Sequence, residues 1–221
     1  MNHLILSEAY LQQFNADYVK SDIVRSGNPY IDGELHKLFL KTLKQQGLTS
    51  ILNLGDKPEE GEEYARAERE WAAINCVNYG RIGLEGSNYE PLEKWEEMMD
   101  FVQGNEGLML IHCKYGADRT GIGVTLALYL RHAETLEDAF KEGINPRFNK
   151  TKFNMLDHTI YYFLTEVFPK REMDFENWLK EEYDPEVLKK HYDKKVADSS
   201  EETRVRVFNQ IADEGFLHHT T

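Results

Sequence analysis

Short apolar runs recur along the first half of the chain and predict β-strands. The run at 107–113 (GLMLIHC) is almost continuously apolar, which is typical of a strand buried on both faces of a parallel sheet. The run at 48–54 (LTSILNL) predicts a short buried strand. A third strand is predicted within 22–33, where it leads into a turn rich in Gly, Asn and Pro. A fourth is predicted across 75–83. These runs are candidates for the strands of a single sheet.

Helical periodicity fills the intervals between the strands. Residues 34–47 predict a helix that ends at a glycine, with a buried face formed by Leu35, Leu38, Phe39 and Leu43. Further helices are predicted at 58–74, at 91–103 with its proline in the first turn, and at 119–132. The alternation of strands and helices predicts an α/β fold with a mostly parallel central sheet flanked by helices.

The C-terminal part of the chain follows a different pattern. Residues 135–142, 152–168 and about 172–196 predict helices with no strand between them, so we expect a helical portion packed on or beside the sheet. Residues 198–216 predict one more helix or a partly ordered tail, whose charges form a solvated face. The chain of 221 residues fits a single domain, 1–221.

Composition narrows the classes of partner. The formal net charge is −13, which argues against broad electrostatic attraction to nucleic acid or to an anionic membrane. No stretch approaches the length of an apolar membrane span. The N-terminal residues lack the features of a signal peptide, so we expect a cytoplasmic protein, with export by a route without a signal peptide left open. A phosphorylated ligand must therefore be bound by a local positive field.

Only two cysteines occur, so a disulfide framework is excluded. Cys76 lies on the predicted strand 75–83 and is expected to be a small buried apolar residue. A reversible disulfide between Cys76 and Cys113 would protect an oxidisable thiolate, and the sequence leaves it open whether the two are within reach.

The turn at 113–120 concentrates the candidate chemistry. Cys113 ends an apolar strand and the next helix begins near Arg119, which places the turn where ligands bind in α/β folds. Backbone N–H groups of such a turn, together with the helix N-terminus, can bind a tetrahedral anion. Gly116 supplies the conformational freedom that a tight turn requires. The predicted phosphate-binding residues are Lys114, Tyr115, Gly116, Ala117, Asp118 and Arg119.

An anion-binding turn would change the chemistry of Cys113. Facing N–H groups and a guanidinium depress a thiol pKa below its free value of about 8.5, and the thiolate can attack phosphorus to form a phosphocysteine. Arg119 suits bidentate binding of two phosphoryl oxygens. Thr120 can donate its hydroxyl to the sulfur and ease departure of the thiolate.

The stretch HCKYGADRTG (112–121) resembles the signature loop of the cysteine-dependent protein tyrosine and dual-specificity phosphatases. Weaker likeness extends over about 22–168, and residues 169–221 would form a helical C-terminal extension of that core. The resemblance implies a dual-specificity-phosphatase-like fold and a phosphatase with no cofactor and no metal. It also implies that His112 hydrogen-bonds nearby backbone and helps set the environment of the cysteine.

The general acid is not fixed by the sequence. The family resemblance implies an Asp about 30 residues before the cysteine, but residues 81–91 contain none. Glu85 lies on a predicted loop between two glycines and is the first candidate. Asp118 inside the signature turn is the second, and Glu90 at the start of the next helix is the third.

The substrate class also stays open. Besides Arg119, the loop carries one cation, Lys114, and Asp118 offsets it. This balance favours a phosphorylated protein or a small, singly phosphorylated metabolite. The alternatives are an inositol polyphosphate, an inositol pyrophosphate or a phosphoinositide, a catalytically weak phospho-binding module, and an RNA 5′-phosphatase, which the net charge disfavours. The sequence does not determine the oligomeric state.

Overall fold

The computed structural model describes most of the chain between residues 11 and 194. The described ranges are 11–12, 14–28, 33–55, 58–145, 153–171 and 173–194, without the side chains of 33–35 and 58–61. Over these ranges, no helix combines the length and the apolar character needed to cross a membrane. The predicted helix or tail at 198–216 lies outside the described residues.

One five-stranded sheet organises the fold, in the order β1-β2-β5-β3-β4. The strands are β1 (Asp17–Lys20), β2 (Ile23–Ser26), β3 (Leu48–Asn53), β4 (Asn78–Arg81) and β5 (Leu108–His112). β2, β5, β3 and β4 run parallel, and β1 pairs antiparallel with β2. This confirms the predicted α/β fold with a mostly parallel central sheet. The edge strand β1 was not predicted, because four partly exposed residues give no apolar run.

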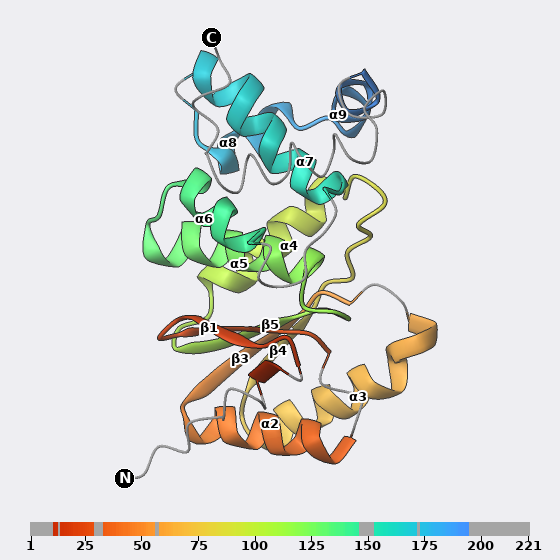
Figure 1. Cartoon of the computed structure of the whole chain (residues 1–221), viewed down its shortest axis with the longest axis vertical. Helices are drawn as coiled ribbons and strands as arrows, with labels where there is room; N and C mark the ends of the chain where they lie inside the picture. Colours follow the sequence, from red (N-terminus) through yellow and green to blue (C-terminus); the bar gives the residue numbers. More distant parts are fainter. Residues whose placement is uncertain are drawn as a thin grey trace.

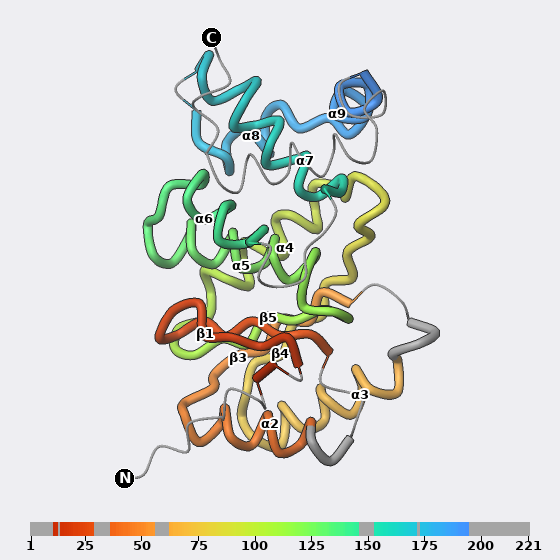
Figure 2. The backbone as a smooth tube through the Cα atoms, in the orientation of Figure 1, coloured from red at the N-terminus to blue at the C-terminus, as the bar shows by residue number. Residues whose placement is uncertain are grey.

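Helices cover both faces of the sheet (Figure 1). On one face lie α2 (Gly33–Gln45) and α3 (Pro58–Ile74); on the other lie α4 (Leu92–Gln103), α5 (Asp118–His132) and α6 (Leu136–Gly143). α7 (Met155–Tyr162), α8 (Phe175–Glu182) and α9 (Pro185–Tyr192) form a further layer beyond α4–α6. The backbone trace shows the same order of layers (Figure 2).

The central strand β5 is buried on both faces, and its side chains divide between two cores. Leu108 and Leu110 pack with the residues of α2 and α3. Met109 and Ile111 pack in the larger cluster, which extends through α4–α6 to the C-terminal helices. The alternation follows from the two-residue period of a strand. It also directs the side chains of His112 and Cys113 toward opposite faces of the sheet.

The buried face of α2 differs from the prediction. His36, Phe39, Leu40 and Leu43 are buried, whereas Leu38 is 51% exposed. Positions 36, 39, 40 and 43 form the i, i+3, i+4, i+7 stripe of a helix, and Leu38 lies outside it. Leu35 belongs to the residues whose side chains are not described.

The C-terminal helices are shorter than predicted. α7 begins at Met155 behind a capping box formed by Asn154 and Asp157, then continues as a π-helical turn, η3 (Phe163–Val167), and a 3-10 turn, η4 (Phe168–Lys170). The predicted helix 172–196 is two helices, because Asp184 caps the start of α9 and Pro185 occupies its first position. Similarly, Pro91 precedes α4 instead of lying in its first turn.

Candidate active site

The signature loop lies at the carboxyl edge of the parallel strands. β5 ends at His112, α5 begins at Asp118, and Cys113–Ala117 connect them. Cys113 and Gly116 are buried, while Lys114 and Tyr115 are exposed. Strand β2 runs beside β5 with Ser26 opposite His112, so the segment that follows β2 borders the loop.

Three successive carbonyl groups of this loop are hydrogen-bonded from outside it. Lys114 O accepts from the backbone N–H of Asn28 (3.0 Å), Tyr115 O from Nδ2 of Asn15 (2.9 Å), and Gly116 O from Nη2 of Arg25 (2.8 Å). In a trans peptide the following N–H points opposite to the carbonyl, and the described residues contain no cis peptide bond. The N–H groups of residues 115–117 therefore face the interior of the loop, as in an anion-binding nest.

Gly116 has the backbone conformation that such a loop requires. Its φ is +73°, a value that L-residues with a Cβ rarely adopt. A Cβ there would lie 2.4 Å from the N of Gly27 and 2.7 Å from the C of Ser26. Both contacts are with backbone, so only glycine allows the loop to pack this closely on the end of β2.

The loop lowers the pKa of the Cys113 thiol. Burial alone acts to raise this pKa, but the Arg119 guanidinium, the Thr120 hydroxyl and the backbone N–H groups of Thr120 and Tyr115 outweigh it. All four groups come from the loop and the first turn of α5. The thiolate is thus the favoured form further into the acid range than for a free cysteine.

Arg119 and Thr120 link the loop to its neighbours. Nη1 of Arg119 donates to the carbonyl of Leu84 at 3.4 Å, which joins the signature loop to the segment that carries Glu85. The buried Thr120 hydroxyl donates to Ser26 O at 3.3 Å and also lies within hydrogen-bonding reach of the Cys113 sulfur. Thr120 therefore links the Cys113 sulfur to the end of β2.

The three candidate acids occupy different environments. Glu85 is exposed and accepts a hydrogen bond from Nδ2 of Asn88 at 2.8 Å. Asp118 is half-buried at the first position of α5. Glu90 is buried, accepts from the backbone N–H of Glu85, and pairs with Nζ of Lys94 at 2.9 Å. These contacts give Glu90 a structural role in closing the loop 85–90, and Glu85 and Asp118 remain the candidates for the general acid.

A buried ion pair supports the strand next to Cys113. Nε2 of His112 lies 3.1 Å from both carboxylate oxygens of Glu68 on α3, and both residues are fully buried. Burial acts to lower the pKa of His112, but Glu68 outweighs it and the pKa is raised. Burial likewise acts to raise the pKa of Glu68, and His112 holds it low. Nδ2 of Asn53 also donates to Glu68, at 3.0 Å.

His36 lies beside this pair but is neutral. Burial lowers its pKa to about 4, whereas the pKa of His112 is raised, so His112 is the histidine of the cluster that holds a proton more readily. Since the charges of Cys113 and His112 interact, the imidazolium stabilises the neighbouring thiolate. Glu68 therefore acts on the Cys113 thiol through His112.

We expect Glu68→Gln to raise the pKa of the Cys113 thiol by about one unit. Without its counter-charge the buried imidazolium of His112 loses its proton, and the thiolate loses a neighbouring positive charge. The pH dependence of alkylation by iodoacetamide measures this pKa. A Cys76→Ser background is needed because Cys76 is exposed. Glu70→Gln, an exposed position on the same helix, is the matched control, and an unchanged profile in Glu68→Gln would contradict the role of the pair.

Arg25 is a second group that the sequence analysis did not identify. Its guanidinium is fully buried, and besides Gly116 it binds the carbonyl of Gly143 at the end of α6, at 3.3 Å. An arginine inside a short apolar strand was the available signal, since a buried charge needs partners. Asn15, Asn28 and Glu68 gave no such signal, because each is a common residue for the turn, loop or charged helix that contains it.

We expect Arg25→Met to weaken the binding of inorganic phosphate about tenfold. Methionine fills similar space but donates no hydrogen bond, and a buried carbonyl left without a donor costs about 1–3 kcal/mol. The peptide of Gly116 would then be free to turn its N–H away from the anion. Calorimetric titration measures the Kd. Arg25→Lys keeps the positive charge but loses the planar guanidinium that donates to two carbonyls at once, so an intermediate Kd is expected. An unchanged Kd in both variants would show that the signature loop keeps its conformation without Arg25.

The two cysteines cannot form a disulfide in this fold. Both are free, and Cys76 is exposed in the turn before β4, where its φ is +51°, so the prediction of a buried Cys76 is wrong. Cys76 precedes its strand whereas Cys113 follows β5, and the two strands run parallel to β3 between them. The two cysteines therefore lie at opposite ends of the sheet, separated along the strand direction by at least the length of a four-residue strand, about 13 Å. A disulfide permits a Cα separation of no more than about 7 Å.

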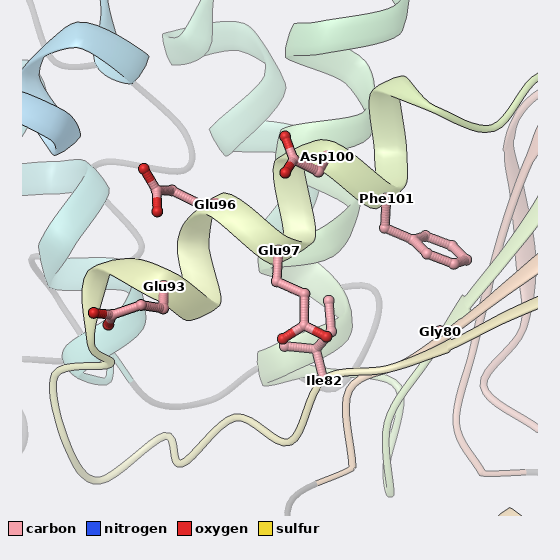
Figure 3. A pocket seen from close by; sticks show the side chains of 7 residues that line it. All are labelled: Gly80, Ile82, Glu93, Glu96, Glu97, Asp100 and Phe101. Carbon is pink, nitrogen blue, oxygen red and sulfur yellow. The ribbon is translucent and has the colours of Figure 1, made fainter.

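A surface depression beside β4 and α4 has the wrong charge for a phosphorylated ligand. Figure 3 shows the carboxylates around it, and its lining consists of Gly80, Ile82, Glu93, Glu96, Glu97, Asp100 and Phe101. Its four acids repel anions. Across the described part of the chain, no three His, Cys, Asp or Glu side chains are grouped so that they could hold a metal ion.

Comparison with known proteins gives similarity in structure alone. No protein-family model and no curated protein matches the chain. Similar solved structures include TpbA of P. aeruginosa (16% identity, 62% of this chain and 76% of that chain, TM-score 0.43) and human DUSP28 (17%, 60% and 86%, 0.41). The catalytic core of Siw14 is similar over 81% of this chain and 90% of that chain, at 19% identity and a TM-score of 0.45.

Proposed function

We propose that this chain is a cysteine-dependent phosphatase that hydrolyses a phosphate monoester through a phosphocysteine intermediate. The observation that carries the proposal is the position of the Cys113 thiol. It lies in a loop whose outward carbonyls turn successive N–H groups inward, and its pKa is lowered by Arg119 and Thr120 against the effect of burial. A thiolate next to an oxyanion site is the arrangement that nucleophilic attack on a phosphate requires.

The reaction takes place in two displacements. In the first, Sγ of Cys113 attacks phosphorus, the bond between phosphorus and the leaving oxygen breaks, and a carboxylic acid protonates that oxygen. Arg119 and the inward N–H groups bind the three equatorial oxygens. In the second, the same carboxylate removes a proton from water, the water oxygen attacks phosphorus, and the bond between sulfur and phosphorus breaks. Thr120 hydrogen-bonds the departing thiolate.

Glu85 is the proposed acid. The carbonyl of the preceding residue, Leu84, accepts a hydrogen bond from Arg119, and Arg119 binds the phosphate, so the backbone at Glu85 adjoins the reacting group. The carboxylate of Glu85 is exposed and accepts a hydrogen bond from Asn88 on the same loop, so it can turn toward a substrate bound at the signature loop. Asp118 is the alternative, and substitution of each residue distinguishes them.

The proposed substrate is a singly phosphorylated group on a protein. Within 113–120, Lys114 and Arg119 are the cations, enough for one phosphate, and Asp118 offsets part of their charge. Tyr115 is 68% exposed at the rim, with Nζ of Lys114 5.3 Å from its ring centroid, which gives a partly apolar surface for a peptide. Arg147, Lys150 and Lys152, which could also line the rim, lie outside the described residues.

Phosphate release from a substrate panel tests the proposal. The panel contains phosphotyrosine and phosphoserine/threonine peptides, phosphoinositides, inositol polyphosphates and pyrophosphates, and triphosphate-ended RNA. We expect release from the phosphopeptides, trapping of a phosphocysteine after acid quench, and neither with Cys113→Ser. Binding of phosphopeptide without turnover would indicate a phospho-binding module, and turnover limited to inositol phosphates would replace the proposed substrate class.

A further inference from the structure

The Glu85 loop, residues 82–91, connects β4 to α4. Helices that follow it in the chain contact it along its length. Nζ of Lys94 on α4 donates to Gly83 O. The first N–H of α7, that of Met155, donates to Gly86 O at 3.4 Å, and the hydroxyl of Tyr183 at the end of α8 donates to Glu90 O at 2.6 Å. Together, α4 and the C-terminal helices fix the backbone on both sides of Glu85, and the C-terminal helices fix it on both sides of Tyr89.

Tyr89 is the first member of a chain of hydrogen bonds that runs from this loop into the C-terminal layer. Its hydroxyl lies 2.7 Å from Nδ1 of His158 on α7. Nε2 of His158 lies 3.0 Å from Nδ1 of His191 on α9, and Nε2 of His191 lies 3.4 Å from Oε1 of Glu166 in η3. The Tyr89 hydroxyl also lies 3.2 Å from the carbonyl of Leu188 on α9. Four segments therefore meet at this chain.

Aromatic rings and one carboxylate are among the groups that contact the two histidines. His158 is fully buried, and aromatic rings pack around it, contributed by Tyr89, Phe153, Tyr161, Tyr162 and Tyr192. Glu166 faces His191 and also pairs with Lys170 at 3.0 Å. Burial, followed by Tyr192, Tyr183 and Asp193, raises the pKa of Tyr89, so its hydroxyl keeps its proton. Histidine is the side chain whose ordinary pKa lies closest to neutral pH, so a change in the protonation of this chain of hydrogen bonds is assigned to the histidine pair.

The number of protons on the pair determines the direction of every hydrogen bond. With both imidazoles neutral, Tyr89 donates to His158, His158 to His191, and His191 to Glu166. With one added proton, His191 donates from both nitrogens, His158 donates to the Tyr89 oxygen, and the Tyr89 hydroxyl donates to Leu188 O. A second added proton places hydrogens on both His158 Nε2 and His191 Nδ1, and the bond between the histidines is lost.

We propose that Tyr89, His158 and His191 are positioning residues that hold the Glu85 loop in place, and that a second proton on the histidine pair releases it. The inference rests on the proposed function, since it assigns a role in catalysis to the hold on that loop. The sign follows from linkage: the held state binds the second proton less readily than the released state, so release is favoured as the pH falls. Because like charges in contact oppose that second protonation, release is expected below the ordinary histidine pKa of about 6.5.

Tyr89→Phe tests the positioning role, because it removes one hydroxyl and keeps the ring. Two measurements are made: amide hydrogen exchange of the peptide covering 83–90, and kcat for alkyl and aryl phosphates. We expect exchange of this peptide to rise about tenfold with the sheet unchanged, and kcat to fall severalfold for alkyl phosphates but little for aryl phosphates. Tyr64→Phe, on α3 across the sheet, is the control. Unchanged exchange, or a rise spread over the whole chain, would overturn the inference.

His191→Asn tests the proton dependence. The Oδ1 atom of asparagine can accept from His158 Nε2 at the place of Nδ1, but the amide takes no proton in this range. In the wild type we expect exchange at 83–90, corrected for the intrinsic effect of pH, to rise as the pH falls below about 6.5. In His191→Asn the exchange of the same segment is expected not to change with pH. If the pH dependence were retained, the inference that protonation of the histidine pair releases the loop would be refuted.

The exchange measurements also separate this inference from the proposed function. A wild-type protein without turnover on any substrate would refute the phosphatase, while the exchange of 83–90 would still report whether the chain of hydrogen bonds holds the loop. In the converse outcome, turnover depends on Cys113 while the exchange of 83–90 is unchanged in the Tyr89 and His191 variants. That result would support the proposed phosphatase and refute the positioning role of these residues.

Discussion

Cys113→Ser is expected to lower phosphate release by at least about 10⁴-fold while leaving the fold and the oxyanion site intact. Loss of a nucleophile removes nearly all covalent catalysis, and a serine hydroxyl is not ionised by the groups that lower the pKa of the Cys113 thiol. Phosphate release from an aryl phosphate measures the loss. Calorimetric titration with inorganic phosphate should give a Kd close to that of the wild type, since the loop backbone and Arg119 are unchanged.

The matched control for this prediction is Cys76→Ser. Cys76 is exposed in the turn before β4, at the edge of the sheet opposite to the signature loop, so its replacement should leave turnover unchanged. Turnover that survives in Cys113→Ser would refute the phosphocysteine mechanism. Loss of turnover in Cys76→Ser instead would assign the chemistry to a different part of the molecule.

Glu85→Gln is expected to have the second-largest effect and to show it on one class of substrate. Protonation by a positioned acid contributes about 10²–10⁴-fold, and an alkoxide leaving group needs that proton while a good aryl leaving group does not. We therefore expect kcat to fall about 10²–10³-fold for alkyl phosphates and less than about tenfold for aryl phosphates. The ratio of the two rates, measured at one pH, is the diagnostic quantity.

Two further variants complete this test. Asp118→Asn should leave the ratio of alkyl to aryl rates unchanged if Glu85 is the acid, and should lower it if Asp118 is. Glu90→Gln should lower the alkyl rate more than the aryl rate, but by less than Glu85→Gln does, because Glu90 holds the backbone N–H of Glu85 and pairs with Lys94. An equal loss on both substrates in Glu85→Gln would remove Glu85 from proton transfer.

The fold and the nucleophile loop could be predicted because their determinants are local. A continuous apolar run predicts a strand buried on both faces, and β5 is such a strand, at Leu108–His112. Gly116 has the positive φ that a tight turn implies. The charged helix 58–74 has the bounds that its pattern predicts. Each of these features depends on a few neighbouring residues and on the period of a strand or helix.

Features that depend on register or on distant partners were not predicted correctly. Leu38 is exposed because the orientation of α2 is set by the sheet beneath it. Cys76 is exposed because its strand begins three residues later than predicted, at Asn78, which leaves Cys76 in the preceding turn. The edge strand β1 carries no apolar run. Its position depends on pairing with β2, which a window of local sequence does not contain.

The sequence by itself determined the α/β architecture, the place of Cys113 at the end of a buried strand, and the presence of Arg119 and Thr120 in the next turn. The tertiary structure decided what surrounds them: Arg25, Asn15 and Asn28 on the loop carbonyls, Glu68 behind His112, and the C-terminal helices against the Glu85 loop. The physical reason is that strands and helices follow from the periodicity of neighbouring residues. Buried hydrogen bonds and charges instead need partners, and here those partners lie tens of residues away along the chain.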